Sequence, residues 1–264
     1  MRAAQTPPAT QPSLLRVAIY DDAGGSGAGP RNISSCLQPQ PETFSSQRIT
    51  ADDIRAGALK NFDVLVQPGG GASNQAAALG TRGRQAIRDF VHAGGGYVGI
   101  CAGAYLATTN YPWSLHILNA KVLDSRHWAR GTGKVQIKLS NDGQNLLGAS
   151  SQIVNIYYGQ GPLLAPDTKP GLPAYETLAS YKTEIARNGA PRGIMKGATA
   201  IAAAPYGQGR VLCISPHPEK STPLHTFIRH AILWAGANSA GNSAPTTQPA
   251  AASPAAQSGA ADAQ

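Results

Sequence analysis

The feature that most constrains how this chain can fold is a cysteine flanked by glycines, Gly99-Ile100-Cys101-Ala102-Gly103. It follows an apolar segment typical of a strand and precedes an alanine-rich segment typical of a helix. Glycines two residues before and after a nucleophilic side chain are typical of a nucleophile elbow, a strand-to-helix turn so sharp that larger neighbours would clash. A cysteine there sits at a helix N-terminus, where unpaired backbone N–H groups favour the thiolate.

A second motif, Ser215-Pro216-His217-Pro218-Glu219, supplies the partners that a cysteine nucleophile requires. Proline biases the residue before it towards extended backbone, and residues i and i+2 of an extended segment project to the same side. We therefore expect His217 and Glu219 to pair, with the carboxylate orienting the ring while its other nitrogen faces the thiol. The alternative is that Cys101 is a buried structural cysteine and His217 a loop histidine.

The first half of the chain alternates between predicted strands and helices. Residues 14–20, 62–66 and 97–100 form apolar runs typical of buried strands, and the second run leads into a glycine-rich loop. Residues 82–93 have the apolar spacing of a helix, which three glycines end. This alternation predicts a parallel sheet with helices on both faces.

The second half has a different pattern. Residues 135–139, 152–158 and 175–180 alternate apolar with polar side chains, which predicts shorter, partly antiparallel strands. A hairpin is expected where residues 198–205 and 210–214 flank the turn Tyr206-Gly207-Gln208-Gly209, and a last helix is expected over residues 222–234.

We expect one domain, residues 14–237, between two polar tails. Residues 1–13 and 238–264 contain too little apolar surface to offset the entropy of ordering, so we expect both to be disordered. The start lacks the charged and apolar regions of a secretory signal, which favours the cytoplasm by default. Such tails also suit an exported protein whose signal was removed or whose start was misassigned.

Composition argues against several classes of function. The net charge is +8, but charged residues make up only 14% and form no dense basic block, so we expect no nucleic-acid partner. No apolar run approaches the length of a membrane span. Cys36, Cys101 and Cys213 match neither a disulfide framework nor a metal-ligand spacing. We expect a small-molecule substrate, no metal and no cofactor, and the sequence does not identify a protein partner.

Together these motifs resemble the class I glutamine amidotransferase-like superfamily, and within it most closely the biotin-protein ligase N-terminal-domain family. The resemblance covers nearly all of the predicted domain. The matching segments are residues 64–71 (VLVQPGGG), 94–105 (GGGYVGICAGAY), 157–162 (YYGQGP) and 206–210 (YGQGR), the last leading to residues 215–219 (SPHPE). No ligase catalytic domain follows in this sequence.

The resemblance implies an α/β fold, a flavodoxin-like three-layer sandwich with a mostly parallel sheet. It also implies that Cys101, His217 and Glu219 form a catalytic triad.

The resemblance further implies an oxyanion hole made by the backbone N–H groups of Gly69, Gly70 and Ala102, at the carboxyl ends of the strands. A plain tight turn is the alternative reading of the glycines. One departure concerns the substrate: glutamine-using members continue the elbow as Gly-His-Gln, whereas here Ala104 and Tyr105 stand in the place of the last two residues.

Tyr105, Tyr158 and Gly161 are the substrate-binding candidates, and Tyr157, His127 and Arg130 are further candidates for lining a pocket. For the tyrosines, ordinary packing is the alternative. Two functions stay open at this point. One is a cysteine-dependent hydrolase or acyl-transfer enzyme that acts on a small amide-like substrate and is not a true glutaminase. The other is a non-catalytic ligand-binding or regulatory module that retains the elbow.

Overall fold

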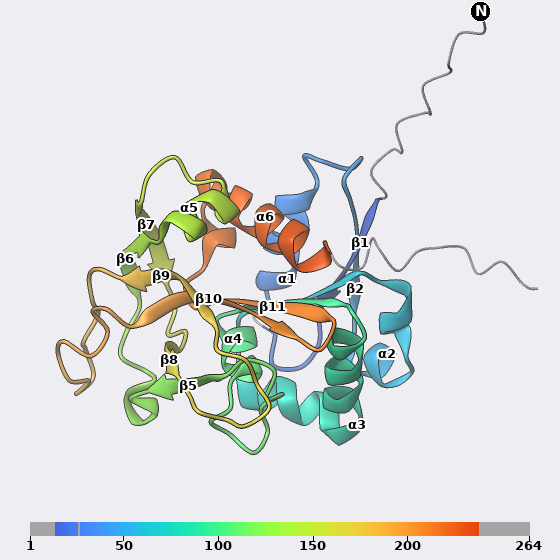
Figure 1. The fold of residues 1–264 in the computed structure, drawn as a ribbon, viewed down its shortest axis with the longest axis horizontal. Helices are drawn as coiled ribbons and strands as arrows, with labels where there is room; N and C mark the ends of the chain where they lie inside the picture. The colour runs from blue at the N-terminus through green and yellow to red at the C-terminus, as the bar shows by residue number, and fades with distance from the viewer. Residues whose placement is uncertain (1–13, 26, 238–264) are drawn as a thin grey trace, which may run out of the picture.

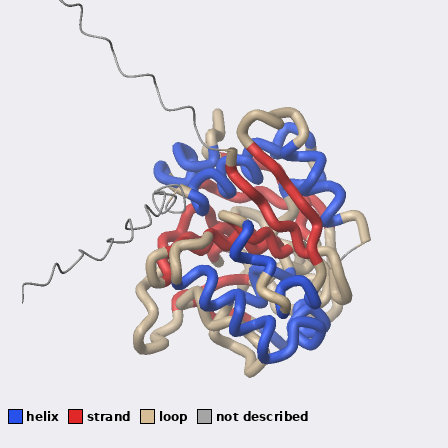
Figure 2. The backbone as a smooth tube through the Cα atoms, turned by 90° about the vertical axis from the view of Figure 1, so that its right-hand side faces the viewer, coloured by secondary structure: helices blue, strands red, loops and turns tan. Residues whose placement is uncertain are grey.

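The computed structural model describes residues 14–25 and 27–237, which are arranged in three layers (Figure 1). Figure 2, turned by 90° from Figure 1, shows strands lying between two groups of helices. The residues predicted to form the two tails lie outside the described part of the chain.

The helices divide between the two faces of one central sheet. One face is covered by α1 (Gly29–Leu37) and α6 (His225–Gly236), with α5 (Asn141–Leu147) beside α6. The other face is covered by α2 (Ala51–Arg55), α3 (Ala72–His92) and α4 (Ala102–Ala107). Short 3-10 turns cover Ala58–Asn61, Ser125–His127, Pro218–Lys220 and Thr222–Leu224.

One half of the sheet is entirely parallel, as the alternating sequence predicts. In spatial order its strands are β2 (Phe44–Ile49), β1 (Leu15–Tyr20), β3 (Val64–Gln67), β4 (Gly96–Ile100) and β11 (Gly209–Ile214). Helices on both faces of a parallel sheet confirm the expected flavodoxin-like class.

The other half of the sheet is antiparallel. It continues from β11 through β10 (Thr199–Tyr206), β9 (Glu176–Tyr181), β6 (Gly133–Leu139) and β7 (Ile153–Tyr158), which is an edge strand. A short pair, β5 (Ala120–Leu123) and β8 (Leu163–Pro166), branches from β10. The predicted hairpin is confirmed, because β10 and β11 pair in register around the turn after Tyr206.

The parallel strands are buried on both faces. Along β1, Val17 and Ile19 join the apolar cluster that includes residues of α1 and α6, whereas Ala18 and Tyr20 join the cluster that includes residues of α3 and α4. Every residue of β3 and β4 is buried. This two-sided burial explains why these strands appear in the sequence as continuous apolar runs.

The predicted helix at residues 82–93 is too short. Helix α3 begins at Ala72, and Gly80 interrupts it with the non-helical angles φ 60° and ψ −175°. Only the part after the interruption has the regular apolar spacing, so the pattern predicted that part alone. No helix in the described residues is both long and apolar enough to cross a membrane.

Candidate active site

Three strand ends bring the predicted site residues together. Cys101 follows β4, the Pro68–Gly71 loop follows β3, and the segment holding His217 follows β11. These strands are neighbours in the parallel half of the sheet, so their carboxyl ends meet at one edge, where α/β folds hold their ligands.

Cys101 occupies a strained turn between β4 and α4. Its φ of 51° and ψ of −99° lie in a region that side-chain-bearing residues rarely adopt. The flanking glycines are sterically required: a Cβ on Gly99 would lie 2.6 Å from the Gly103 carbonyl oxygen, and one on Gly103 would lie 2.2 Å from that of Gln67. The geometry is that of a nucleophile elbow.

His217 lies between Cys101 and Glu219. Its Nδ1 atom lies 2.7 Å from the Glu219 carboxylate, and the ring also hydrogen-bonds to Cys101. All three residues are at most 5% exposed. The pairing matches the expectation, but the backbone reason for it was wrong: Pro218–Lys220 is a 3-10 turn, so the segment is not extended as far as Glu219.

The surroundings favour the charged form of His217. Burial alone would lower its pKa, but hydrogen bonds and charge interactions with Cys101 and Glu219 outweigh burial and raise the pKa to about 10. The backbone holds the ring as well, because the His217 N–H donates to the Tyr157 carbonyl oxygen at 2.8 Å. An imidazolium held against a sulfur atom is the arrangement that stabilises a thiolate.

Gly69 and Gly70 lie beside Cys101, which Ala102 follows in the chain. A Cβ on Gly69 would lie 3.5 Å from the Cys101 Cβ and 2.8 Å from the His217 ring, so only glycine fits between them. Gly70 has a φ of 140°, a conformation that also favours glycine. In the described part of the chain, no acceptor takes the N–H of Gly70 or of Ala102.

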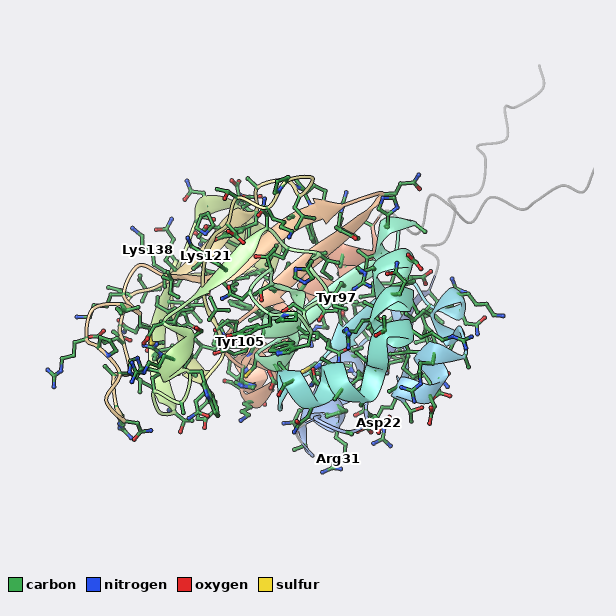
Figure 3. All side chains as sticks on the ribbon, turned by 90° about the horizontal axis from the view of Figure 1, so that it is seen from below. Asp22, Arg31, Tyr97, Tyr105, Lys121 and Lys138 are labelled. Atoms are coloured by element: carbon green, nitrogen blue, oxygen red, sulfur yellow. The ribbon has the colours of Figure 1, made fainter. Side chains whose placement is uncertain are left out.

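A cavity of about 340 Å³ lies beside the Cys101 side chain. Tyr105, on α4, lines it, and Figure 3 labels this tyrosine among the other side chains. Tyr158 and Gly161 lie behind the wall: the Tyr158 hydroxyl donates to the Gly161 carbonyl oxygen at 2.9 Å, and neither residue lines the cavity.

The cavity is also lined by residues to which the sequence analysis gave no role. Among them, the rings of Tyr111 and Trp113 stack with their centroids 4.4 Å apart. Ser73, Ser125, Trp128 and Gln160 line it too. The aromatic pair just after the elbow helix was the available signal. Ser125 and Trp128 line the cavity because the loop after β5 folds back towards Cys101, and no local sequence pattern shows this.

Two other candidates, His127 and Arg130, form a cluster around Asp124. The Asp124 carboxylate lies 2.5 Å from His127 Nδ1 and accepts a hydrogen bond from an Arg130 Nη2 at 2.7 Å. Burial would raise the pKa of Asp124, but these two partners outweigh burial and lower it. Arg130 is only 1% exposed. Tyr157 lies outside the cavity and lines a different hollow.

The other two cysteines lie in environments that disfavour a thiolate. Burial, helped by the negative charge of Glu219, raises the pKa of Cys36 to about 12. Burial raises the pKa of Cys213 further still. Neither side chain is exposed at all, and neither lines the cavity beside Cys101.

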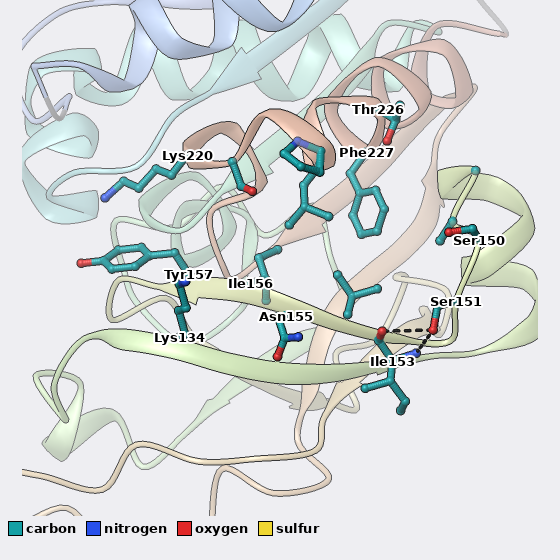
Figure 4. Close-up of a pocket in the computed structure, with 16 residues that line it drawn as sticks. Lys134, Ser150, Ser151, Ile153, Asn155, Ile156, Tyr157, Lys220, Thr226 and Phe227 are labelled. Carbon is teal, nitrogen blue, oxygen red and sulfur yellow. Dashed lines mark hydrogen bonds between the residues drawn. The ribbon is translucent and has the colours of Figure 1, made fainter.

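A larger groove, of about 820 Å³, lies along β7 where the chain enters α6 (Figure 4). Lys134, Tyr157 and Lys220 stand at one end, and the ammonium of Lys220 lies 4.3 Å from the centroid of the Tyr157 ring. Ser150, Ser151 and Phe227 stand at the other end. No cysteine, histidine or carboxylate lines it.

Comparison with known families bears on the resemblance read from the motifs. Residues 15–129 match the family model described as biotin-protein ligase, N terminal. The resemblance is confirmed. The matched part of this chain includes the glycine-rich loop and the elbow, whereas His217 and Glu219 lie beyond it. No curated protein sequence matches the chain.

Solved structures support the same fold. A ThuA-like protein from Bacteroides uniformis has a TM-score of 0.57 and 12% identity, over 88% of this chain and 95% of that protein. A cytoplasmic protein from Salmonella typhimurium has a TM-score of 0.54 and 12% identity, over 84% of this chain and 99% of that one. A second cytoplasmic protein from Salmonella typhimurium has a TM-score of 0.52 and 17% identity, over 86% of this chain and 98% of that protein. At such identities the likeness concerns the fold alone.

Proposed function

We propose that this protein is a cysteine-dependent hydrolase or acyl-transfer enzyme that acts on a small amide-like substrate. The observation that carries the proposal is the hydrogen-bonded line Cys101–His217–Glu219, with a strained cysteine at one end and a buried carboxylate at the other. A nucleophile, a base and a group that orients the base make up the machinery of covalent acyl transfer.

In the first half of the reaction, the thiolate of Cys101 attacks the substrate's carbonyl carbon and forms a C–S bond. The carbonyl electron pair moves onto oxygen, and we expect the N–H groups of Gly70 and Ala102 to hold that charge. As the C–N bond breaks, the imidazolium of His217 gives its proton to the departing nitrogen. The products are a neutral amine and a thioester on Cys101.

In the second half, water or another nucleophile attacks the thioester, and neutral His217 takes its proton. The C–S bond breaks, the acyl group leaves as an acid or a new ester or amide, and Cys101 departs as the thiolate beside a recharged His217. Glu219 remains ionised throughout, because its part is to orient the ring and stabilise the imidazolium.

We propose that glutamine is not the substrate. Binding its ammonium and carboxylate requires polar side chains, because unpaired buried charges are costly. Ala104 is fully buried and carries no polar side chain, and Tyr105 offers one hydroxyl on an aromatic ring. An apolar or aromatic part of the ligand is expected to pack against Tyr105.

The test is a panel of small p-nitrophenyl esters and p-nitroanilides, followed by intact-mass and peptide mass spectrometry. We expect an acyl adduct on Cys101 in the native enzyme and none on Cys36 or Cys213. Cys101→Ala should abolish both the adduct and the release of nitrophenol or nitroaniline. Equal release by Cys101→Ala would overturn the proposal, and so would equal acylation of all three cysteines.

Glutamine serves as the matched negative substrate. We expect ammonia release well below an ordinary enzymatic turnover of order 1 per second. Release at that rate, abolished by Cys101→Ala, would contradict this part of the proposal. A ligand that raises the melting temperature while no acyl donor ever labels Cys101 would instead support a non-catalytic binding module.

A further inference from the structure

We infer that the substrate carries an aromatic ring, which stacks against Trp128 and its neighbouring aromatic side chains in the cavity beside Cys101. The inference rests on the function proposed above, and it narrows the substrate to an amide that bears an aryl group. Three observations carry it: the composition of the cavity wall, the exposed ring of Trp128, and the hydrogen bonds that fix these rings in place.

The wall of the cavity is rich in aromatic side chains. Four of the residues that line it are Tyr105, Tyr111, Trp113 and Trp128, so two of the chain's three tryptophans meet in a cavity of about 340 Å³. Within residues 14–25 and 27–237, no lysine, arginine, histidine, aspartate or glutamate lines it. Ring contacts and neutral hydrogen bonds are therefore the main sources of affinity that this wall offers a small ligand.

Trp128 presents an uncovered ring to this cavity. Its exposed fraction of 56% is the largest among the big apolar side chains that the structure describes. No other aromatic ring of the described residues packs against it. An exposed indole leaves a large apolar area in contact with water, and a ligand ring stacked on it would bury that area.

The turn that carries Trp128 is anchored to the rest of the molecule. The Arg130 side chain donates a hydrogen bond to Asp124 at 2.7 Å, which closes the turn. The Ala129 carbonyl oxygen accepts a hydrogen bond from the Asn188 side chain, also at 2.7 Å. The backbone beside the exposed ring is therefore held in place, so a ligand that stacks on the ring has little chain to order.

The other rings of the wall are fixed as well. The rings of Tyr111 and Trp113 stack with an interplanar angle of 5°, and the Tyr105 ring lies 6.4 Å from that of Tyr111. Their loop is tied back to α4, because the Leu115 N–H donates to the Leu106 carbonyl oxygen at 2.7 Å. These rings form one aromatic surface that begins on the elbow helix. Such a surface favours a substrate ring over a saturated group of the same size.

A matched pair of alkylating reagents tests the inference at Cys101 itself. N-benzyl-2-chloroacetamide and N-(cyclohexylmethyl)-2-chloroacetamide share the reactive group and the count of heavy atoms, but only the first carries an aromatic ring. With both reagents the Cys101 thiolate forms a C–S bond and displaces chloride. We would measure both rates at Cys101 by peptide mass spectrometry and divide the benzyl-to-cyclohexyl ratio by the same ratio for glutathione.

We expect the benzyl reagent to be preferred about fivefold, the effect of one or two aromatic contacts. Trp128→Leu should remove most of this preference, and Trp128→Phe should retain most of it. The matched control is Arg126→Gln, which changes an exposed residue of the same turn that does not line the cavity, and it should keep the preference. In the native protein, benzamide should protect Cys101 from iodoacetamide better than cyclohexanecarboxamide does, which tests the site even if the Trp128 variants do not fold.

Three results would count against these ideas, and they fall on different claims. Rapid alkylation of Cys101 by both reagents, with a benzyl-to-cyclohexyl ratio equal to that of glutathione, would overturn the aromatic substrate alone. A benzyl preference that Trp128→Leu leaves unchanged, or that Arg126→Gln lowers as much, would overturn the stacking on Trp128. Failure of every reagent, iodoacetamide included, to react faster at Cys101 than at Cys36 would instead overturn the proposed function.

Discussion

Two hollows of this molecule differ in size and in chemistry, and the smaller of the two lies beside Cys101. The groove along β7 has about 820 Å³ but is lined by lysines, serines and apolar side chains (Figure 4). The cavity beside Cys101 has about 340 Å³, and the strained cysteine that lines it neighbours a buried histidine–glutamate pair. Volume alone is therefore a poor guide to the site.

The difference follows from where each hollow lies in the sheet. The cavity forms where the carboxyl ends of β3 and β4 meet, so loops from separate parts of the chain converge on it. The groove lies along β7, an edge strand of the antiparallel half. Strained and buried polar groups are costly and are tolerated chiefly where function uses them, which favours the cavity.

The largest expected effect comes from removing the base. His217→Gln should lower the acylation rate of Cys101 by about a hundredfold or more, the usual contribution of general acid–base catalysis. The measurement is the rate of nitrophenol release from the most reactive ester of the panel. Lys220→Met, a change in the groove, is the control and should keep most of the rate. A larger loss in Lys220→Met than in His217→Gln would move the site to the groove.

A matched pair of bulky substitutions probes the two hollows directly. Ser125 lines the cavity and Ser150 lines the groove, and both are exposed. Ser125→Trp should obstruct Cys101 and slow its alkylation by iodoacetamide about tenfold, whereas Ser150→Trp should change the rate by less than about twofold. Melting temperatures would show that both variants are folded. If both variants slowed the alkylation of Cys101 equally, access to Cys101 would depend on the groove as well as on the cavity.

The raised pKa of His217 predicts a pH dependence of stability. A histidine whose pKa rises from 6.5 to about 10 on folding stabilises the protein fully below about pH 6.5, and this contribution is lost as the pH rises through about 10. His217→Gln should therefore flatten the fall in the free energy of unfolding between pH 7 and pH 10, measured with urea under reducing conditions. His225→Gln, a change next to the groove, should retain the native slope. If the free energy of unfolding of His217→Gln fell with pH as steeply as that of the native protein, the positive charge assigned to His217 would be contradicted.

The smallest effect is expected from the C-terminal segment. We propose that residues 14–237 are the folding unit, so deleting residues 238–264 should change the melting temperature by less than about 2 °C, because the segment has no apolar face to dock. Alkylation at Cys101 should be unchanged too. A large loss of stability would place the segment against the domain, where it would redefine the surface around one of the hollows.

The sequence predicted the parallel half of the fold better than its surroundings. Strands such as β3 and β4 are buried on both faces and appear as uninterrupted apolar runs. By contrast, β2 has only its first and last residues buried, so the segment Phe44–Ile49 looks like a polar loop. The short strands β5 and β8 are defined by their pairing to each other, a contact between segments distant in sequence.

The site divides in the same way. The three proposed catalytic residues Cys101, His217 and Glu219 lie in two local motifs, so residue spacing grouped them. The contact between Asp124 and Arg130 depends on a left-handed conformation at Asp124, with a φ of 50°, which brings its carboxylate back to the arginine. The walls of the cavity depend on how loops return to the sheet, and no residue pattern encodes that return.

The central claim is that Cys101 is an activated nucleophile, and the most direct test compares the three cysteines of the native protein. Each would be alkylated with iodoacetamide at neutral pH, and the three rates would be measured by peptide mass spectrometry, before and after His217→Ala. Our account predicts that Cys101 reacts far faster than Cys36 and Cys213, whose burial disfavours the thiolate, and that His217→Ala removes most of that advantage. Equal rates at all three cysteines in the native protein would contradict it.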